Sequence, residues 1–460
     1  MNSLDADVII VGAGLSGIGS ACHLREHCPD RSLLIIEGRE SMGGTWDLFR
    51  YPGVRSDSDM HTLGYNFRPW RESKAIADGP SILNYIRRTA QDHRVESLIR
   101  FGHWLQSADW CSDTGCWTLT VHDRVNDATV TLRSRFLLMC AGYYSYRQGH
   151  QPVFPGRETF RGDFIHPQFW PEDFDASGKR IVVIGSGATA MTLVPELAKT
   201  AEEVVMLQRS PTYVITRPAR DSLANLLRRL LPERWAYAAT RWKNTTMQQW
   251  LYRRSRKSPE QLKKYLIGEV RKKVGDTLDV DRHFTPSYNP WDQRLCLVPD
   301  DDLFNALRAG SAKVVTDRIA RLTEHGIELE SGEYLDADVI VSATGLELVV
   351  MGDAAFSVDG RAVDFADTWT YKGVMCSDIP NLVSVFGYIN ASWTLRADLT
   401  AEWFCRLLNH MRERDAHIAV PRVPDALRSM PDRDWIDDFS AGYMRRVMHR
   451  FPRQGDRAPW

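Results

Sequence analysis

The chain has 460 residues, of which 43% are hydrophobic and 25% are charged, an ordinary composition for a globular protein. One hydrophobic core rarely serves so long a chain, so two or three domains are expected. The formal net charge of −1 gives the whole chain no polyelectrolyte character. Since no nucleic-acid-binding motif is present either, no nucleic-acid partner is expected.

The distribution of cysteines and apolar residues points to a cytoplasmic protein. Eight cysteines are scattered along the chain without a metal-type CxxC pair, so no metal site is expected and free thiols in a reducing compartment are the simplest interpretation. The N-terminal sequence MNSLDADVIIVGAG carries acidic residues where a secretory signal has basic ones. No stretch approaches the roughly 18 apolar residues of a membrane span.

The first glycine-rich motif lies near the N-terminus. A short apolar run over 7–11 precedes it, a helix is predicted over 18–27, and a second apolar run over 33–36 ends at Glu37. This order of strand, glycine turn, helix, strand and acid is typical of a dinucleotide site, in which the helix N-terminus faces the diphosphate. A carboxylate after the second strand can accept hydrogen bonds from ribose hydroxyls. The glycines of this motif are Gly12, Gly14 and Gly17.

A second copy of the motif follows an apolar run over 179–184. Arg209 occupies the position that Glu37 has in the first copy, and an arginine can bind the 2′-phosphate that a carboxylate would repel. We therefore expect FAD at the first site and NADPH at the second, although Arg209 could also be a solvated surface charge. The predicted NADPH-binding residues are Gly185, Gly187, Thr189, Ala190, Arg209 and Ser210.

Two dinucleotide sites with different ribose chemistry imply electron transfer between two cofactors. NADPH would donate the hydride and FAD would accept it. Two further predicted strands end in small residues, over 137–142 and 339–345. Such residues let backbone pass close to a ligand, although each could equally be an ordinary exit from a sheet.

An aromatic segment between the two motifs, FRGDFIHPQFWPE over 160–172, has neither helical nor strand periodicity. It matches the fingerprint FxGxxxHxxxWP(D/E) of the Baeyer–Villiger monooxygenases, which are class B flavin monooxygenases, at every position. The chain therefore resembles this family, whereas the related heteroatom-oxidising flavin monooxygenases usually have tyrosine in place of Trp170. The fingerprint residues are Phe160, Gly162, His166, Trp170, Pro171 and Glu172.

The resemblance covers essentially the whole chain. Segments that look like this family are GGTW, RYPGVRSD and NPWDQR, and those most similar to its ethionamide-activating branch are SMGGTWDLFRYPGVRSDSDM, YNPWDQRLCLVP and NASWTL. The resemblance implies that FAD is bound with the help of Gly44, Thr45, Trp46 and Asp57.

The resemblance also implies two catalytic residues. Arg294 matches an arginine that lies near the flavin and stabilises anionic charge there, because its guanidinium stays protonated. Asp57 matches the acidic residue that holds this arginine in place. A plain buried salt bridge between Asp57 and Arg294 is the structural alternative.

The chemistry that the resemblance implies begins with reduction of FAD by NADPH. Oxygen then adds to the reduced flavin as a C4a-peroxide, which attacks a ketone and gives an ester or lactone. Oxidation of thioether or thioamide sulfur is implied as a further activity. Two alternatives stay open. One is a heteroatom-oxidising flavin monooxygenase, against which Trp170 and Arg294 argue, and the other is a flavin-bound redox sensor without physiological turnover.

Four further residues have a functional and a structural interpretation. His166 is not expected to be a general base, because in this family the fingerprint couples domain movement to cofactor position. A structural histidine is the alternative, and Trp170 could anchor its loop in a core. Asn390 and Trp393 resemble a segment near the nicotinamide and the substrate, although an aromatic side chain there could serve packing alone.

The order of the motifs predicts an α/β fold with two Rossmann-like dinucleotide-binding domains, for FAD and NADPH, and a helical insertion. Linkers are expected over 143–155 and after Leu335. The sequence does not indicate an oligomeric state. The predicted spans are 1–143 and 336–460 for the FAD domain, 144–216 and 288–335 for the NADPH domain, and 217–287 for the insertion.

The insertion is strongly basic and has leucines at helical spacing. Residues 217–276 contain 16 Lys and Arg against 5 Asp and Glu, a local charge of +11. Such a segment could attract the phosphates of NADPH or make a weak peripheral contact with anionic lipid. We favour a third interpretation, a solvated cap over the substrate tunnel, because interfacial helices need apolar and basic faces opposed along their length.

Overall fold

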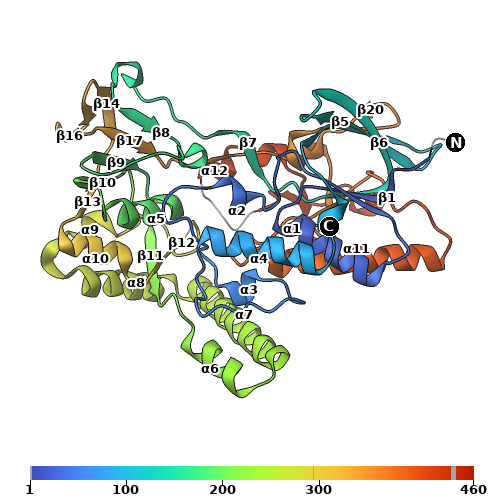
Figure 1. The fold of residues 1–460 in the computed structure, drawn as a ribbon, viewed down its shortest axis with the longest axis horizontal. Coiled ribbons are helices and arrows are strands. Elements are labelled where there is room, and N and C mark those ends of the chain that lie inside the picture. The colour runs from blue at the N-terminus through green and yellow to red at the C-terminus, as the bar shows by residue number, and fades with distance from the viewer. Residues whose placement is uncertain (1–2, 294, 437–441) are drawn as a thin grey trace.

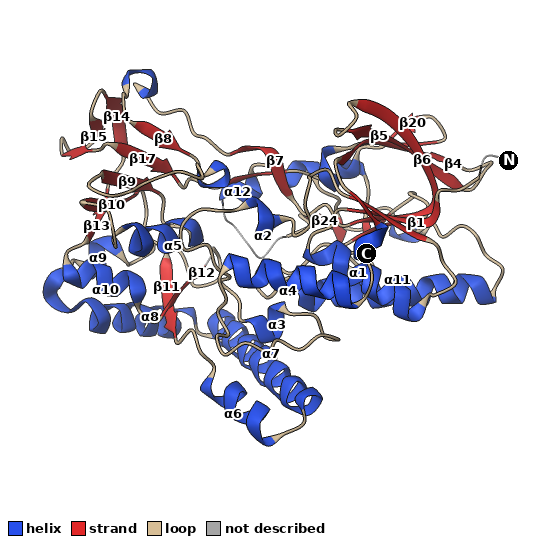
Figure 2. Ribbon diagram, viewed as in Figure 1, coloured by secondary structure: helices blue, strands red, loops and turns tan. Residues whose placement is uncertain are grey.

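The structure is a computed structural model that describes residues 3–293, 295–436 and 442–460. Two halves built on β-sheets lie side by side, and a pair of helices, α6 and α7, projects beyond them (Figure 1). Strands occupy one side of both halves, and most of the long helices line the other side (Figure 2). This is the α/β architecture that the two glycine-rich motifs predicted.

The first half is built around β1 (Ala6–Val11), which pairs in parallel with β2 (Leu33–Ile36) and β6 (Ala128–Met139). Nearly all of β1 is buried, as expected for a strand inside a parallel sheet. In the described part of the chain the sheet has nine strands in the order β20-β19-β4-β5-β6-β1-β2-β3, and β23 also pairs with β6. The others are β3 (Ile99–Arg100), β4 (His103–Cys111), β5 (Cys116–Asp123), β19 (Ala355–Val358), β20 (Arg361–Ala362) and β23 (Leu382–Ser384).

Helices α1 (Leu15–His27), α4 (Gly79–Asp92) and α11 (Thr394–Glu413) form a layer with the first sheet. Ile10, Ile18 and Phe404 belong to the core of this layer and are completely buried. Full burial of such a side chain stabilises the fold by roughly 1.5–3 kcal/mol. A second core, which includes Trp110, Trp117 and Phe356, belongs to the same half. The turn between β1 and α1 is thus anchored on both sides.

The second half contains a parallel sheet in the order β13-β10-β9-β17-β8. Its strands are β8 (Asp163–Ile165), β9 (Arg180–Ile184), β10 (Glu203–Gln208), β13 (Ala312–Thr316) and β17 (Val339–Ser342). Helices α5 (Ala188–Leu197) and α10 (Asp302–Ala309) share a core with it, and the antiparallel strands β14 (Ile319–Thr323), β15 (Gly326–Leu329) and β16 (Tyr334–Asp336) share another.

The boundary predicted between residues 335 and 336 is too early in the chain. Strand β17 pairs with both β9 and β8, so it is a central strand of the second sheet and not part of the first half. The chain returns to the first half only after β17, through β18 (Leu346–Leu348), which pairs antiparallel with β7 (Tyr144–Gly149). The outgoing and returning connections between the halves therefore lie side by side.

The segment 217–287 is largely helical and contains α6 (Ser222–Leu230), α7 (Glu233–Lys257), α8 (Pro259–Val274) and α9 (Val280–His283). Parallel strands β11 (Tyr213–Arg217) and β12 (Leu295–Pro299) flank it in sequence. Arg241 of α7 fixes it to the first half: its Nη1 donates to the carbonyl oxygens of His61 at 3.0 Å and Gly64 at 2.8 Å. These carbonyls lie at the end of α3 (Met60–Leu63), where backbone acceptors need partners.

The remaining α-helices and strands of the described residues are short. They are α2 (Thr45–Leu48), α12 (Gly442–Arg445), β21 (Thr370–Tyr371), β22 (Met375–Cys376), β24 (Asp432–Arg433) and β25 (Gln454–Gly455). Among the described residues, none of the helices combines the length and the apolar character that crossing a bilayer requires.

Candidate functional site

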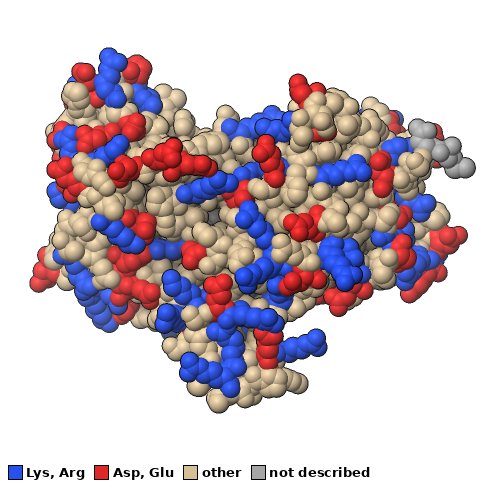
Figure 3. All heavy atoms as spheres, viewed as in Figure 1, with Lys and Arg blue, Asp and Glu red and all other residues tan. Residues whose placement is uncertain are grey.

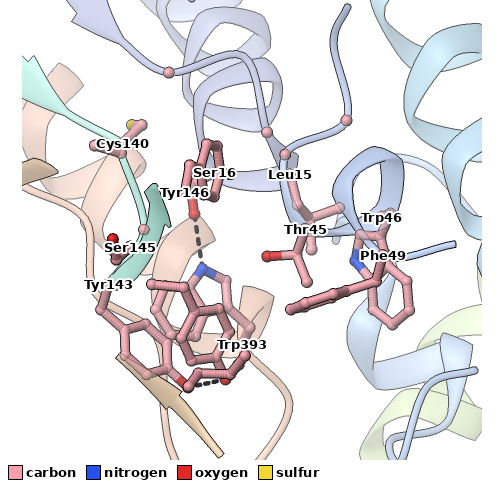
Figure 4. Close-up of a pocket in the computed structure, with 18 of the residues that line it drawn as sticks. Leu15, Ser16, Thr45, Trp46, Phe49, Cys140, Tyr143, Ser145, Tyr146 and Trp393 are labelled. Carbon is pink, nitrogen blue, oxygen red and sulfur yellow. Dashed lines mark hydrogen bonds between the residues drawn. The ribbon is translucent and has the colours of Figure 1, made fainter. Parts of the chain in front are cut away.

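A cavity of ≈ 420 Å³ lies between the two halves, and both glycine-rich motifs contribute to its lining. The β1–α1 turn and the start of α2 form part of its wall, and the first turn of α5 reaches it from the second half. Figure 4 shows Thr45, Trp46 and Phe49 on one side, Tyr143 and Ser145 on the other, and Trp393 between them. A ligand here would touch both dinucleotide motifs.

The first glycine turn leaves no room for a side chain at Gly12 or Gly17. Gly12 has φ +105°, and a Cβ there would lie 2.6 Å from the carbonyl oxygen of Cys140, which follows β6. A Cβ on Gly17 would collide with the carbonyl oxygen of Gly12. Gly44 also has positive φ, and its Cβ would come within 3.0 Å of the Gly14 Cα. Two glycine backbones thus face each other and form a narrow cradle, which fits the predicted diphosphate.

Glu37 is buried at the end of β2 and lines the cavity. Its Oε2 accepts the backbone N–H of Ala13 at 2.8 Å, and its Oε1 accepts that of Arg39 at 3.0 Å. Burial raises the pKa of this carboxyl, and the two N–H groups act in the opposite direction. Each oxygen keeps a further lone pair, so Glu37 can hold the glycine turn and accept a ribose hydroxyl at the same time.

The second glycine turn has the same backbone but is more open. Gly185 has φ +137° and packs against the carbonyl oxygen of Ala343, which follows β17, whereas a Cβ on Gly187 would meet nothing within 4 Å. Ala190 is completely buried, and Thr189 lines the cavity. Arg209 and Ser210 lie exposed after β10, outside the cavity lining. The Ser210 carbonyl accepts a hydrogen bond from Ser186 Oγ at 3.1 Å.

His166 lies where the two connecting strands meet, outside the cavity lining. Its Nδ1 accepts the backbone N–H of Gln168 at 3.2 Å, so Nε2 must carry the proton that is donated to the Gly345 carbonyl, also at 3.2 Å. Burial lowers the pKa of this imidazole. A Cβ on Gly149 at the end of β7 would collide with the ring. His166 therefore contacts both connections as a neutral ring.

The other fingerprint residues pack around the second sheet. Phe160 belongs to one of its cores, and Gly162 lies so close to the Asp338 carbonyl that no side chain would fit. Trp170 is half-buried, with its ring 5.0 Å from that of Phe174. Pro171 is exposed, and Glu172 beside it forms an ion pair of 2.8 Å with Arg50 of the first half.

Of the two predicted catalytic residues, Arg294 lies outside the described residues. Asp57 lines the cavity from the loop that follows α2, although its side chain is largely exposed. Arg55, two positions earlier, was not predicted. It also lines the cavity and binds Asp302 of the second half, with 2.5 Å between Nη1 and Oδ2.

Asn390 and Trp393, the two residues predicted near the substrate, both line the cavity. The Trp393 indole stacks on Tyr143 with ring centroids 5.3 Å apart and an interplanar angle of 10°. Its Nε1 donates to Ser16 Oγ at 2.7 Å, the contact drawn as a dashed line in Figure 4. The Trp393 side chain therefore packs against its neighbours and also forms part of the cavity wall.

Sequence reasoning missed several cavity residues. Tyr143, Tyr144 and Tyr146 come from the first connection between the halves, where the run YYSY was a signal that the prediction did not use. Gln248 of α7 and Trp291 reach the cavity from the insertion and the loop after it. No local pattern marks Gln248, whereas Trp291 belongs to the family-like segment NPWDQR but was not assigned a role. Trp291 also has φ +73°, a conformation in which bulky residues are strained and which is often found at functional sites.

Comparisons with known proteins agree with this geometry. The model of the family "Flavin-binding monooxygenase-like" matches residues 5–414. The FAD-containing monooxygenase EthA of Mycobacterium tuberculosis is 50% identical over 455 residues, which are 99% of this chain and 92% of that protein. The probable FAD-binding monooxygenase AlmA of Acinetobacter baylyi is 46% identical, over 99% of this chain and 91% of its own length.

Solved structures share the fold. A complex of OTEMO with FAD and NADP has a TM-score of 0.74 at 24% identity and covers 91% of this chain and 88% of its own. An ε-caprolactone-bound cyclohexanone monooxygenase has a TM-score of 0.76 at 20% identity and covers 92% of this chain and 90% of its own. By its sequence match, its fold and its paired glycine turns, the chain belongs to the flavin-binding monooxygenase-like family.

Proposed function

We propose that the protein is an FAD- and NADPH-dependent Baeyer–Villiger monooxygenase that converts ketones to esters or lactones. One atom of O2 would become the new ester oxygen and the other would leave as water, with NADPH supplying two electrons as a hydride and a proton completing the water. The observation that carries the proposal is that both glycine-rich motifs contribute to the lining of one cavity. Two cofactors bound at these motifs could approach each other there and exclude bulk water.

The residues of the first turn suit FAD. The facing backbones of Gly14 and Gly44 leave a groove for a diphosphate, and Glu37 offers carboxylate oxygens to a ribose without a 2′-phosphate. When bound, FAD supplies the redox chemistry that links NADPH to O2. The names of the relatives and the bound ligands of the similar structures support the same pair of cofactors.

The second turn suits NADPH. Gly187 leaves space for a pyrophosphate at the N-terminus of α5, where backbone N–H groups favour anions. Arg209, exposed after β10, can form a charge-assisted hydrogen bond with a 2′-phosphate without first leaving another site. The fingerprint residue His166 is a positioning residue in this proposal, because it contacts the connections and not the cavity.

The reaction also needs positive charge at the oxygen chemistry, and we assign this role to Arg294. Its neighbours in sequence, Trp291 and Leu295, both line the cavity, and so does its proposed partner Asp57. A permanently charged guanidinium stabilises anionic oxygen more strongly in a water-poor cavity than in bulk water. An enzyme that oxidises only sulfur or nitrogen has less need of such a charge, and this favours the Baeyer–Villiger assignment over the heteroatom-oxidising alternative.

Product analysis tests the proposal. The purified, FAD-loaded protein should consume NADPH in the presence of linear ketones and form the corresponding esters, with oxidation of thioethers or thioamides as a secondary activity. Sulfoxide without any ester would instead indicate a heteroatom-oxidising monooxygenase. Failure to insert oxygen into any ketone or sulfide would favour the redox sensor.

Arg294→Ala tests the catalytic assignment. Loss of one such electrostatic group typically lowers kcat by roughly 10²–10³-fold. Ester formation at the normal rate by this variant would refute the role of Arg294. FAD content, measured from the visible absorption spectrum, separates a loss of chemistry from a loss of cofactor.

A further inference from the structure

The apolar side of helix α6 faces away from the protein, which does not fit the solvated cap that the sequence favoured. Its leucines Leu223, Leu226 and Leu230 follow one another at helical spacing on one stripe, and all three are exposed. Such a stripe normally faces a core, yet Ala224 is the buried position of this helix. The helix therefore presents its apolar side to the surroundings, at the end of the molecule that projects beyond both halves (Figure 1).

Helix α7 continues this apolar surface with tryptophans. Trp235, Trp242 and Trp250 are 72%, 71% and 63% exposed. At 3.6 residues per turn, spacings of seven and eight place all three on one side of the helix. The opposite side is anchored, because Ala236, Tyr237 and Thr240 are buried. Large aromatic side chains are seldom left in water on a monomer unless they meet a partner.

Basic residues surround this surface. Between residues 222 and 259 the chain has nine Lys and Arg and a single acid, Glu233, which is engaged by Arg71 at 2.6 Å. Arg229, Arg234 and Arg253 are exposed on the same two helices. Blue Lys and Arg side chains accordingly dominate over red ones on the projecting part of the face seen in Figure 3.

We propose that this surface, the α6–α7 face (Leu223, Leu226, Leu230, Trp235, Trp242 and Trp250), docks on an anionic lipid bilayer. Tryptophan is the side chain that prefers the boundary between headgroups and acyl chains, and leucines can enter that boundary from an amphipathic helix. Arginines beside them meet the negative surface potential of the headgroups. Apolar area and positive charge on one projecting hairpin match a bilayer better than they match solvent.

Docking would also place the cavity near the bilayer. Gln248, on the same helix and two positions before Trp250, lines the cavity. Helix α7 thus separates the cavity on one side from the α6–α7 face on the other. A sparingly soluble ketone or thioether dissolved in the membrane would need only a short path to the cavity. The bilayer contact itself is independent of the reaction that the cavity carries out.

Vesicle flotation tests the proposal with the FAD-loaded protein and no substrate. We expect the protein to float with vesicles of phosphatidylcholine mixed with phosphatidylglycerol at low salt, and much less with phosphatidylcholine alone. Added salt should release it, because surface charges are screened beyond a Debye length of about 10 Å at 0.1 M. Trp235→Ala combined with Trp242→Ala should lower the vesicle partition coefficient by roughly tenfold or more, since two of the three aromatic anchors are lost.

Matched controls distinguish docking from general stickiness. Tyr334→Ala and Leu399→Ala remove exposed apolar side chains elsewhere and should leave flotation unchanged. Arg229→Glu with Arg234→Glu should abolish the preference for anionic vesicles, whereas Arg161→Glu should not. The proposal is overturned if the wild type stays in the dense fraction at low salt, or if the double tryptophan variant floats as well as the wild type. It is also overturned if the wild type is a dimer that the tryptophan variants dissociate, because a second copy would then cover the face.

Discussion

The two glycine turns share a backbone but differ in how tightly they are enclosed. Gly12 and Gly185 both have positive φ, and each packs against the carbonyl oxygen of the residue that follows a neighbouring strand. The first turn is then closed by Gly44 opposite Gly14, and its acid Glu37 is buried and holds the turn. At the second turn nothing lies near a Cβ on Gly187, and Arg209 stands in solvent.

This difference fits two cofactors with different lifetimes on the protein. A dinucleotide enclosed by a second loop and by a buried acid would leave slowly, as a flavin that stays through many turnovers should. A dinucleotide on an open turn, held by an exposed arginine, could exchange once per turnover. The same local motif can therefore serve a permanent and an exchanging ligand, and the surroundings decide between them.

The largest expected effect comes from a methyl group in the closed turn. Gly17→Ala would force a Cβ into the Gly12 carbonyl oxygen, and neither backbone can move without breaking the strand or the helix. We expect a protein without bound FAD, with a loss of stability of about 1–3 kcal/mol or more from overpacking. Flavin absorbance of the purified variant and its thermal unfolding midpoint provide the measurement.

Gly187→Ala tests the open turn, in which Ala190 already occupies the position that Gly17 has in the closed turn. It should keep the fold and the flavin, because a Cβ there meets nothing within 4 Å, and should raise only the KM for NADPH. Loss of FAD from this variant would contradict the difference between the two turns. Full FAD content in the Gly17→Ala variant would also contradict this difference between the turns.

Local patterns explain which parts of this arrangement could be predicted. Both turns are short segments in which strand, glycines and helix follow one another, so Gly17 and Ala190 were assigned from spacing alone. Gln248 and Trp291 come from segments far from either turn and reach the cavity only because the insertion and the loop after it pack on the first half. The end of the second domain was placed too early because the apolar run of β17 looks the same whichever sheet it joins.

Arg209 gives the next largest effect. Arg209→Ala should raise the KM for NADPH by roughly 10- to 100-fold, since a hydrogen bond to a charged group contributes about 1.5–3 kcal/mol. The KM for NADH should change little, because NADH has no 2′-phosphate. Arg308→Ala, an exposed arginine on α10 of the same half, is the control. An unchanged preference for NADPH in the Arg209 variant would leave the open turn without a specificity residue.

His166 at the joint between the halves predicts a pH effect of intermediate size. Burial lowers its pKa below the ordinary 6.5, so the fold favours the neutral ring. The contribution of the neutral His166 ring to the free energy of unfolding is then fully present above pH 6.5. It is lost as the pH falls through the folded-state pKa, because the unfolded chain binds the proton more readily. A doubly protonated His166 ring could also no longer accept the backbone N–H of Gln168 at Nδ1.

The measurement compares thermal unfolding midpoints across the acid range. The difference between wild type and His166→Asn should shrink as the pH falls below about 6.5, the ordinary pKa of histidine. If the difference in unfolding midpoint between wild type and His166→Asn stayed constant with pH, the pKa of His166 would be the same in the folded and unfolded states.

The smallest effect is expected at the ion pair that links the halves at the surface. Arg50 and Glu172 are 2.8 Å apart, but their side chains are 56% and 76% exposed, and exposed pairs contribute only about 0–1 kcal/mol. Glu172→Gln should therefore leave the unfolding midpoint and the KM for NADPH almost unchanged. Asp302→Asn, which removes the less exposed partner of Arg55 across the same boundary, should cost more. If Glu172→Gln proved to be the costlier change, the exposed charges would contribute most to holding the second half on the first half. The hydrogen bonds of His166 and Gln168 where the two connecting strands meet would then contribute less. We expect Asp302→Asn to be the costlier change, because the partly buried Arg55–Asp302 pair is screened by salt less than the exposed Arg50–Glu172 pair.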